Sequence, residues 1–192
     1  MIDFESYRRR ELSLQDLADP LTKDDLAGLT REMCALQLSL IEDAEDHDFV
    51  FVPDDPEAND TFAARPEDAG LSWTLGHVVV HTTASSEESA ALALVLARGL
   101  PIDGRSRYEV PWEQVRTVAF ARHRIGESLQ MRLSMLAAWP DEPHLDNFYS
   151  PYEGRPAMNA MGRFLGGLAH DDSHVEQIRK IMVQARQLRA AI

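Results

Sequence analysis

Two pairs of histidines have the spacing that lets one helix present two imidazoles to a metal ion. His77 and His81 stand in the run G-H-V-V-V-H, and His170 and His174 stand in A-H-D-D-S-H. Side chains four residues apart on a helix leave the same face, with Cβ atoms about 5–6 Å apart. Two such imidazoles can share one ion with metal–nitrogen bonds of about 2.0–2.1 Å. The spacing predicts a metal site drawn from two helices, and it offers His77 as readily as His81.

The alternative is that these histidines are ordinary packed or solvated residues, because a single H-x-x-x-H pair arises often by chance. The second pair, however, shares a helix face with Phe164, Val175 and Ile178. An imidazole on an apolar face needs a hydrogen bond or a metal, since burying it unsatisfied costs about 1–3 kcal/mol. Three imidazoles with one position left open would form the arrangement of a catalytic metal site.

Residues beside the histidines could support such a site. His77 could be a fourth ligand, a partner of a ligand or a packed histidine, and we favour the last two roles. Asp171 and Asp172 could orient a ligand imidazole by accepting its other N–H, although solvated charge is the simpler interpretation. Glu88 lies on the face of His81 two turns along, where it could reach the site or form a solvent-facing salt bridge.

Four segments with helical periodicity must position these residues, and Pro- and Asp-rich loops separate them. They cover residues 22–41, 72–98, 111–138 and 159–191. Thr22 followed by Asp25 approximates a capping box, Gly99 ends the second segment, and Pro111 suits the first turn of the third. The pattern predicts an all-α four-helix bundle with long connecting loops, in which metal sites form on facing helices.

Length and composition limit the domain organisation and the kinds of partner that the protein can have. A chain of 192 residues fits one bundle domain over 22–192, preceded by a segment, 1–21, that packs on the bundle or on a partner subunit. The net charge of -13 disfavours nucleic acid and anionic membrane surfaces. A single cysteine, Cys34, rules out an intramolecular disulfide and Cys-rich zinc sites. Neither a signal peptide nor a membrane-spanning run is visible, so we expect a cytoplasmic protein. As its partner we expect a small-molecule substrate.

The run W-T-L-G-H-V-V-V-H at 73–81, together with H-D-D-S-H-V-E-Q-I at 170–178, resembles the DinB/YfiT-like superfamily of metal-dependent enzymes. In that superfamily a histidine eight residues after the tryptophan is a metal ligand, and a His-x-x-x-His pair on the last helix supplies two more. The resemblance therefore implies His81, His170 and His174 as ligands. The first run is also similar to mycothiol-dependent maleylpyruvate isomerases, but those enzymes carry Glu at the position of His170.

The resemblance also implies a range of functions. Characterised members of the superfamily are thiol S-transferases and isomerases, so a low-molecular-weight thiol is an expected cofactor and a metal-dependent hydrolase is a close variant. Imidazole ligands suit several metals, of which we expect zinc or nickel. The alternative is a non-catalytic metal-binding or stress-linked module that mediates interaction or dimerisation. A homodimer is expected in either case.

Overall fold

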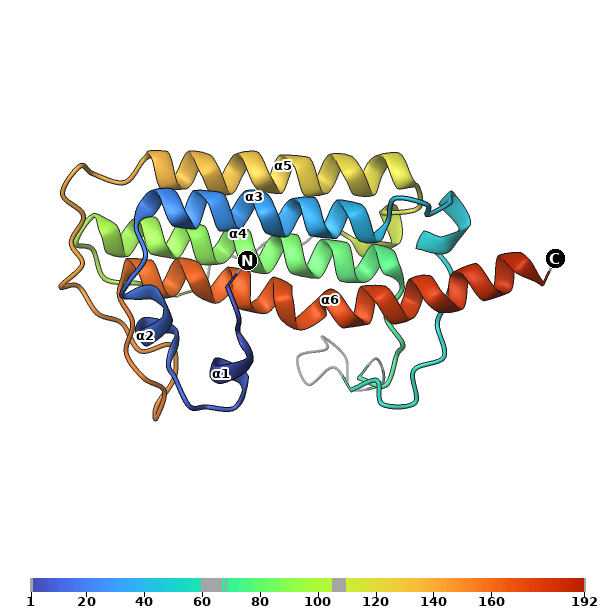
Figure 1. Cartoon of the computed structure of the whole chain (residues 1–192), viewed down its shortest axis with the longest axis horizontal. Coiled ribbons are helices and arrows are strands. Elements are labelled where there is room, and N and C mark those ends of the chain that lie inside the picture. The colour runs from blue at the N-terminus through green and yellow to red at the C-terminus, as the bar shows by residue number, and fades with distance from the viewer. Residues whose placement is uncertain (1, 60–66, 68, 105–109, 192) are drawn as a thin grey trace.

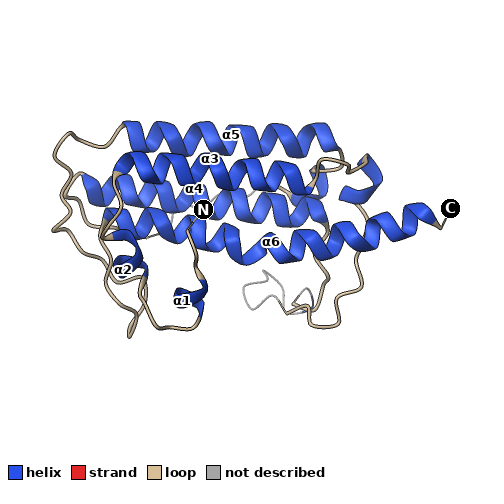
Figure 2. Cartoon of the chain, in the orientation of Figure 1, coloured by secondary structure: helices blue, strands red, loops and turns tan. Residues whose placement is uncertain are grey.

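Four long helices lie side by side in a bundle (Figure 1). The computed structural model describes residues 2–59, 67, 69–104 and 110–191. The four helices are α3 (Lys23–Leu40), α4 (Leu75–Ala97), α5 (Val118–Ala137) and α6 (Ala160–Ala190). Helices α3 and α6 run in one direction and α4 and α5 in the other, so the end of α4 and the beginning of α5 lie at opposite ends of the bundle. The predicted four-helix bundle is confirmed, and among the described residues the regular elements are all helical (Figure 2).

The N-terminal segment packs against this bundle through two short helices, α1 (Glu5–Arg8) and α2 (Leu14–Ala18). Phe4, Leu14 and Ala18 are buried in the same apolar cluster as Phe164 and Leu165 of α6. No helix in the described ranges has both the length and the apolar character needed to cross a membrane.

Side-chain caps decide where the long helices begin. Thr22 and Asp25 form the predicted capping box at the start of α3. The third long helix was predicted from Pro111, and this start is wrong: Pro111 precedes a single 3-10 turn, η3 (Trp112–Gln114), and α5 begins at Val118. The hydroxyl of Thr117 accepts a hydrogen bond from the Phe120 amide, which caps α5 there. Proline suits a first helical turn, but the threonine cap outweighs it.

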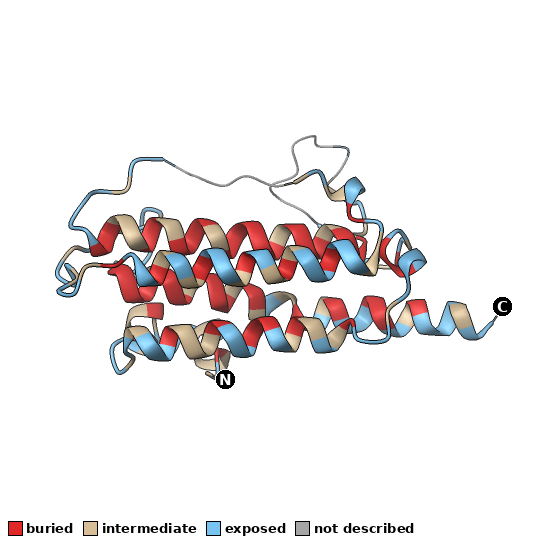
Figure 3. Cartoon of the chain, turned by 90° about the horizontal axis from the view of Figure 1, so that it is seen from above, coloured by how far each residue is buried: buried red, intermediate tan, exposed pale blue. Residues whose placement is uncertain are grey.

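Buried residues line the inward faces of the long helices (Figure 3). They form two apolar clusters with a polar layer between them. One cluster joins α2 to the beginning of α6 and the end of α4, and the other joins the beginning of α4 to the later turns of α6. The layer between them contains buried polar side chains from all four helices: Gln37, Ser85, Ser86, Ser128, Arg132 and Asp171. Polar groups in such a layer need partners within the bundle.

Helices α4 and α6 lie in close contact at Gly167. A Cβ atom on Gly167 would lie 2.8 Å from Ser89 Cβ and 3.1 Å from Ser86 Cα. The Ser86 hydroxyl also donates a hydrogen bond of 3.0 Å to the Gly167 carbonyl. The contact fixes the separation of the two helices one turn before His170.

We expect Gly167→Ala to lower the free energy of unfolding by about 1–3 kcal/mol, because the added methyl group must push the two helices apart. The matched controls are Gly28→Ala in α3 and Gly126→Ala in α5, where a Cβ would meet no atom within 4 Å. Both controls should raise the free energy of unfolding by about 0.5–1 kcal/mol, since alanine loses less backbone entropy. Urea denaturation measures all three. Equal stabilisation by the three substitutions would contradict the close approach.

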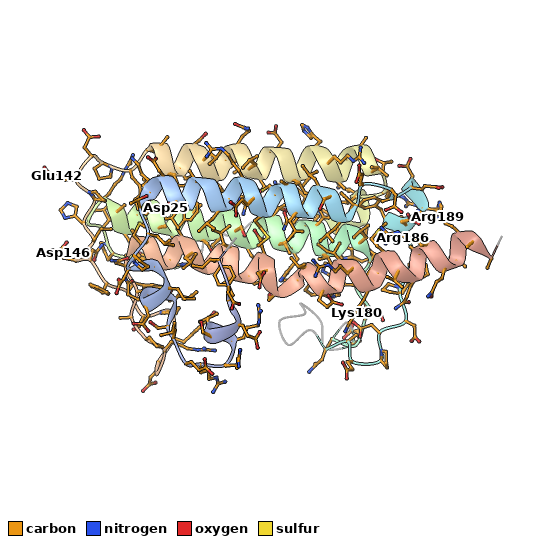
Figure 4. All side chains as sticks on the ribbon, viewed as in Figure 1. Asp25, Glu142, Asp146, Lys180, Arg186 and Arg189 are labelled. Atoms are coloured by element: carbon orange, nitrogen blue, oxygen red, sulfur yellow. The ribbon has the colours of Figure 1, made fainter. Side chains whose placement is uncertain are left out.

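The C-terminal turns of α6 extend past the ends of the other helices and are tied to the connection that follows α3. Arg186 and Arg189 lie together near this end (Figure 4). Arg186 donates two hydrogen bonds to Asp43, of 2.6 and 2.7 Å, and lowers the pKa of that carboxyl to about 2. Arg189 pairs with the buried Asp48. These ion pairs anchor the projecting part of α6.

Candidate metal centre

Three histidines meet between α4 and α6. His81 comes from α4, and His170 and His174 come from successive turns of α6. One nitrogen from each ring lies within 4.8 Å of the other two, and the Nε2 atoms of His81 and His170 are 3.1 Å apart. All three side chains are half-buried, so the cluster lies at the edge of the core. In the described part of the chain, these three residues form the only cluster of possible ligands that could hold a metal ion.

The spacing of the three rings fits a divalent ion. Tetrahedral coordination with bonds of about 2.0–2.1 Å places two ligand nitrogens about 3.3–3.4 Å apart. The 3.1 Å between His81 and His170 is close to this value. Their ring centroids are 4.8 Å apart, as are those of His170 and His174, while those of His81 and His174 are 5.0 Å apart. His81 and His170 therefore already have the spacing of two ligands, and a nitrogen of His174 lies within 4.8 Å of both.

Gln177 determines which nitrogen His174 can offer. The Nδ1 atom of His174 lies 2.8 Å from the side-chain oxygen of Gln177, one turn further along α6. Because an amide oxygen only accepts, this contact requires the proton on Nδ1, which in the neutral ring leaves the lone pair on Nε2. Such a hydrogen bond orients the ring and makes the ligand nitrogen more basic. The sequence showed Gln177 only as the end of a motif, without this role.

Two tryptophans and His77 form an aromatic stack beside the three histidines. Trp73 stacks on His77 at 4.2 Å between ring centroids, and Trp112 stacks on the same imidazole at 5.2 Å. Trp73 also lies 4.6 Å from His81 and is parallel to His174 within 11°. His77 thus belongs to this aromatic stack and not to the three-histidine group. Trp73 therefore contacts two of the three histidines as well as His77.

The carboxylates beside the histidines are placed differently from the prediction. Asp171 is not solvated: it is 1% exposed, and it accepts a hydrogen bond of 2.8 Å from Arg132 of α5. Burial raises the pKa of the Asp171 carboxyl, and the positive charge of Arg132 opposes this. Asp172 pairs instead with Arg8 of the N-terminal segment. Both aspartates therefore join α6 to other elements.

The position of Glu88 on α4 also differs from the prediction. Glu88 is buried, so the solvent-facing salt bridge that we considered for it is wrong. The preceding residue, Glu87, forms a two-point ion pair with Arg124 of α5, with distances of 2.6 and 2.8 Å. This pair joins α4 to α5.

Sequence reasoning missed Arg132 altogether. The guanidinium is 1% exposed and donates to the sulfur of Cys34 at 2.6 Å as well as to Asp171. Burial raises the pKa of the Cys34 thiol, so it stays protonated at neutral pH and is not a candidate nucleophile. The available signal was position: Arg132 follows Ala121, Ile125 and Ser128 along the buried stripe of its helix.

The fold and the histidine cluster together define an all-helical bundle protein with a potential metal site. A family model described as the DinB superfamily matches residues 13–178 of the chain. The chain therefore belongs to the DinB superfamily, as its motifs predicted. No curated protein and no solved structure matches the chain significantly.

Proposed function

We propose that this protein is a metal-dependent enzyme that binds one divalent ion, zinc or nickel, through His81, His170 and His174. The observation that carries the proposal is the convergence of three imidazole nitrogens within 4.8 Å, with no carboxylate or thiol of the described residues joining them. Three protein ligands leave a coordination position for a small molecule, as in catalytic zinc sites. A structural site would more commonly be closed by a fourth ligand.

We further propose that the reaction is S-transfer from a low-molecular-weight thiol. In such a step the sulfur forms a bond to an electrophilic carbon, the leaving group departs with its electron pair, and the thiol proton passes to solvent. A bound divalent ion would lower the pKa of a thiol, or of water in a hydrolase, at the open position. The choice of thiol over water rests on the resemblance of the two histidine motifs to thiol-dependent members of the superfamily.

The protein's own side chains would prepare the site for this chemistry. Gln177 holds His174 in the tautomer that presents Nε2. Trp73 covers one side of His81 and His174 with an apolar ring, which restricts water there. Both contacts favour a site whose ligands are oriented before the ion binds.

Metal content tests the binding claim. Protein purified without a histidine tag and reconstituted with zinc or nickel should contain about one equivalent per chain by elemental analysis. Less than roughly a tenth of an equivalent after reconstitution would overturn the proposal.

Thiol conjugation tests the catalytic claim. The wild-type protein, loaded with metal, should accelerate conjugation of a panel of thiols with an activated aryl halide, and His81→Ala should lose the acceleration. His123→Ala, on the exposed face of α5, is the matched control and should react as the wild type does. Equal rates for wild type and His81→Ala would count against catalysis here and favour a metal that only links α4 to α6.

A further inference from the structure

One residue of a buried ion pair lies in the same turn of α6 as two of the candidate ligands. Arg132 and Asp171 are each 1% exposed and meet in the polar layer between the two apolar clusters. Asp171 stands between His170 and His174 in α6. The ion pair and the histidine cluster therefore involve the same turn of the same helix.

Arg132 joins three of the four helices at this level. Its Nη1 donates to Asp171 of α6 at 2.8 Å, and its Nη2 donates to the sulfur of Cys34 in α3 at 2.6 Å. Its Nε lies 3.4 Å from the Ser128 carbonyl of its own helix. A planar guanidinium held at three points has little freedom to move. The Asp171 carboxylate is consequently held in one place relative to α3 and α5.

The position of the Asp171 side chain sets the orientation of the histidine side chains about the axis of α6. Successive residues of an α-helix are separated by about 100°, so fixing one side chain fixes the rotation of the whole turn. An imidazole nitrogen about 6–7 Å from the helix axis would move by about 2 Å if α6 rotated by roughly 20°. Metal–ligand distances tolerate only about 0.2 Å. Small changes in the rotation of α6 would therefore separate His170 and His174 from His81.

A contribution to folding stability does not by itself explain why the bundle contains a buried ion pair. Replacing a buried ion pair with apolar side chains of similar volume is often neutral or stabilising. We propose that Arg132 and Asp171 are positioning residues, whose ion pair sets the rotation of α6 so that His170 and His174 face His81. This inference rests on the proposed function, because it concerns the same three-histidine site.

The test uses the double variant Arg132→Met/Asp171→Leu, which removes the ion pair while retaining side-chain volume. Zinc affinity is measured by competition with a chelator, and Co²⁺ absorption reports the coordination geometry. We expect the variant to fold and to bind zinc about 10–100-fold more weakly, with a changed cobalt spectrum. The control, Arg186→Gln/Asp43→Asn, removes an exposed ion pair further along α6 and should keep wild-type affinity.

A second variant covers the case in which the double variant does not fold. Arg132→Lys keeps the buried charge but loses the fork that reaches Asp171 and Cys34 together, and we expect about 10-fold weaker zinc binding. Wild-type zinc affinity and an unchanged cobalt spectrum in either folded variant would overturn the positioning role while leaving the metal site intact. Failure of the wild-type protein to bind zinc would instead overturn the proposed function, and the positioning role with it.

Discussion

Asp171→Ala is expected to lower the free energy of unfolding by about 3–5 kcal/mol. The substitution leaves the Arg132 guanidinium buried in the bundle without its carboxylate, and the Cys34 thiol is only a weak acceptor. A charge in that position is costly, because no solvent reaches it. Urea denaturation followed by circular dichroism measures the loss, with a chelator present so that bound metal does not contribute.

The neighbouring aspartate supplies the control. Asp172 pairs with Arg8, whose side chain is 44% exposed. Asp172→Ala should therefore cost less than about 1 kcal/mol, as exposed ion pairs usually do. Similar losses in the two variants would show that Arg132 is stabilised by other groups. The double variant Arg132→Met/Asp171→Leu should recover most of the stability lost in Asp171→Ala, since it removes both charges.

His170→Ala is expected to lose metal binding almost completely. Two ligands remain, His81 and His174, and they come from different helices without the third nitrogen that completes the group. Metal content should fall from about one equivalent to less than roughly a tenth. Free zinc at 100 times the dissociation constant should stabilise the wild-type protein by about 2.7 kcal/mol and leave the variant unchanged. Elemental analysis and thermal unfolding with and without zinc measure both effects.

His77→Ala is the discriminating control for this prediction. His77 has the same spacing to His81 as His170 has to His174, but its ring lies between Trp73 and Trp112. The His77→Ala variant should therefore keep about one equivalent of metal. If it lost metal as fully as His170→Ala, the ligand set proposed here would be wrong.

Local sequence patterns were sufficient to predict the helices. The capping box of Thr22 and Asp25 and the glycine at position 99 depend on neighbours a few residues away, and both ends were placed correctly within a few residues. The beginning of α5 was not, because Pro111 and Thr117 are both good initiators and the pattern alone does not rank them. Even so, the periodicity of the four long segments determined the fold class.

The choice of histidines needed more than spacing. At four-residue intervals His77 and His81 are equivalent, and only the rotation of α4 decides which ring faces α6. In the structure Trp73 stacks on His77, and His81 meets His170. The motif beginning at Trp73 had already favoured His81 through the family resemblance. The agreement concerns position: the structure brings the three residues together, and binding of a metal remains a prediction.

By itself, therefore, the sequence determined the helices, the bundle and the three histidines, because these depend on local periodicity and on recognisable motifs. Only the tertiary structure decided what surrounds the histidines. Asp171 reads as a surface charge until α5 places Arg132 opposite it, 39 residues earlier in the chain. Trp112 likewise reaches His77 from a 3-10 turn, where the sequence had predicted the first turn of a long helix. Such partners depend on how the helices pack and rotate against one another, and residue spacing within one helix carries no information about that.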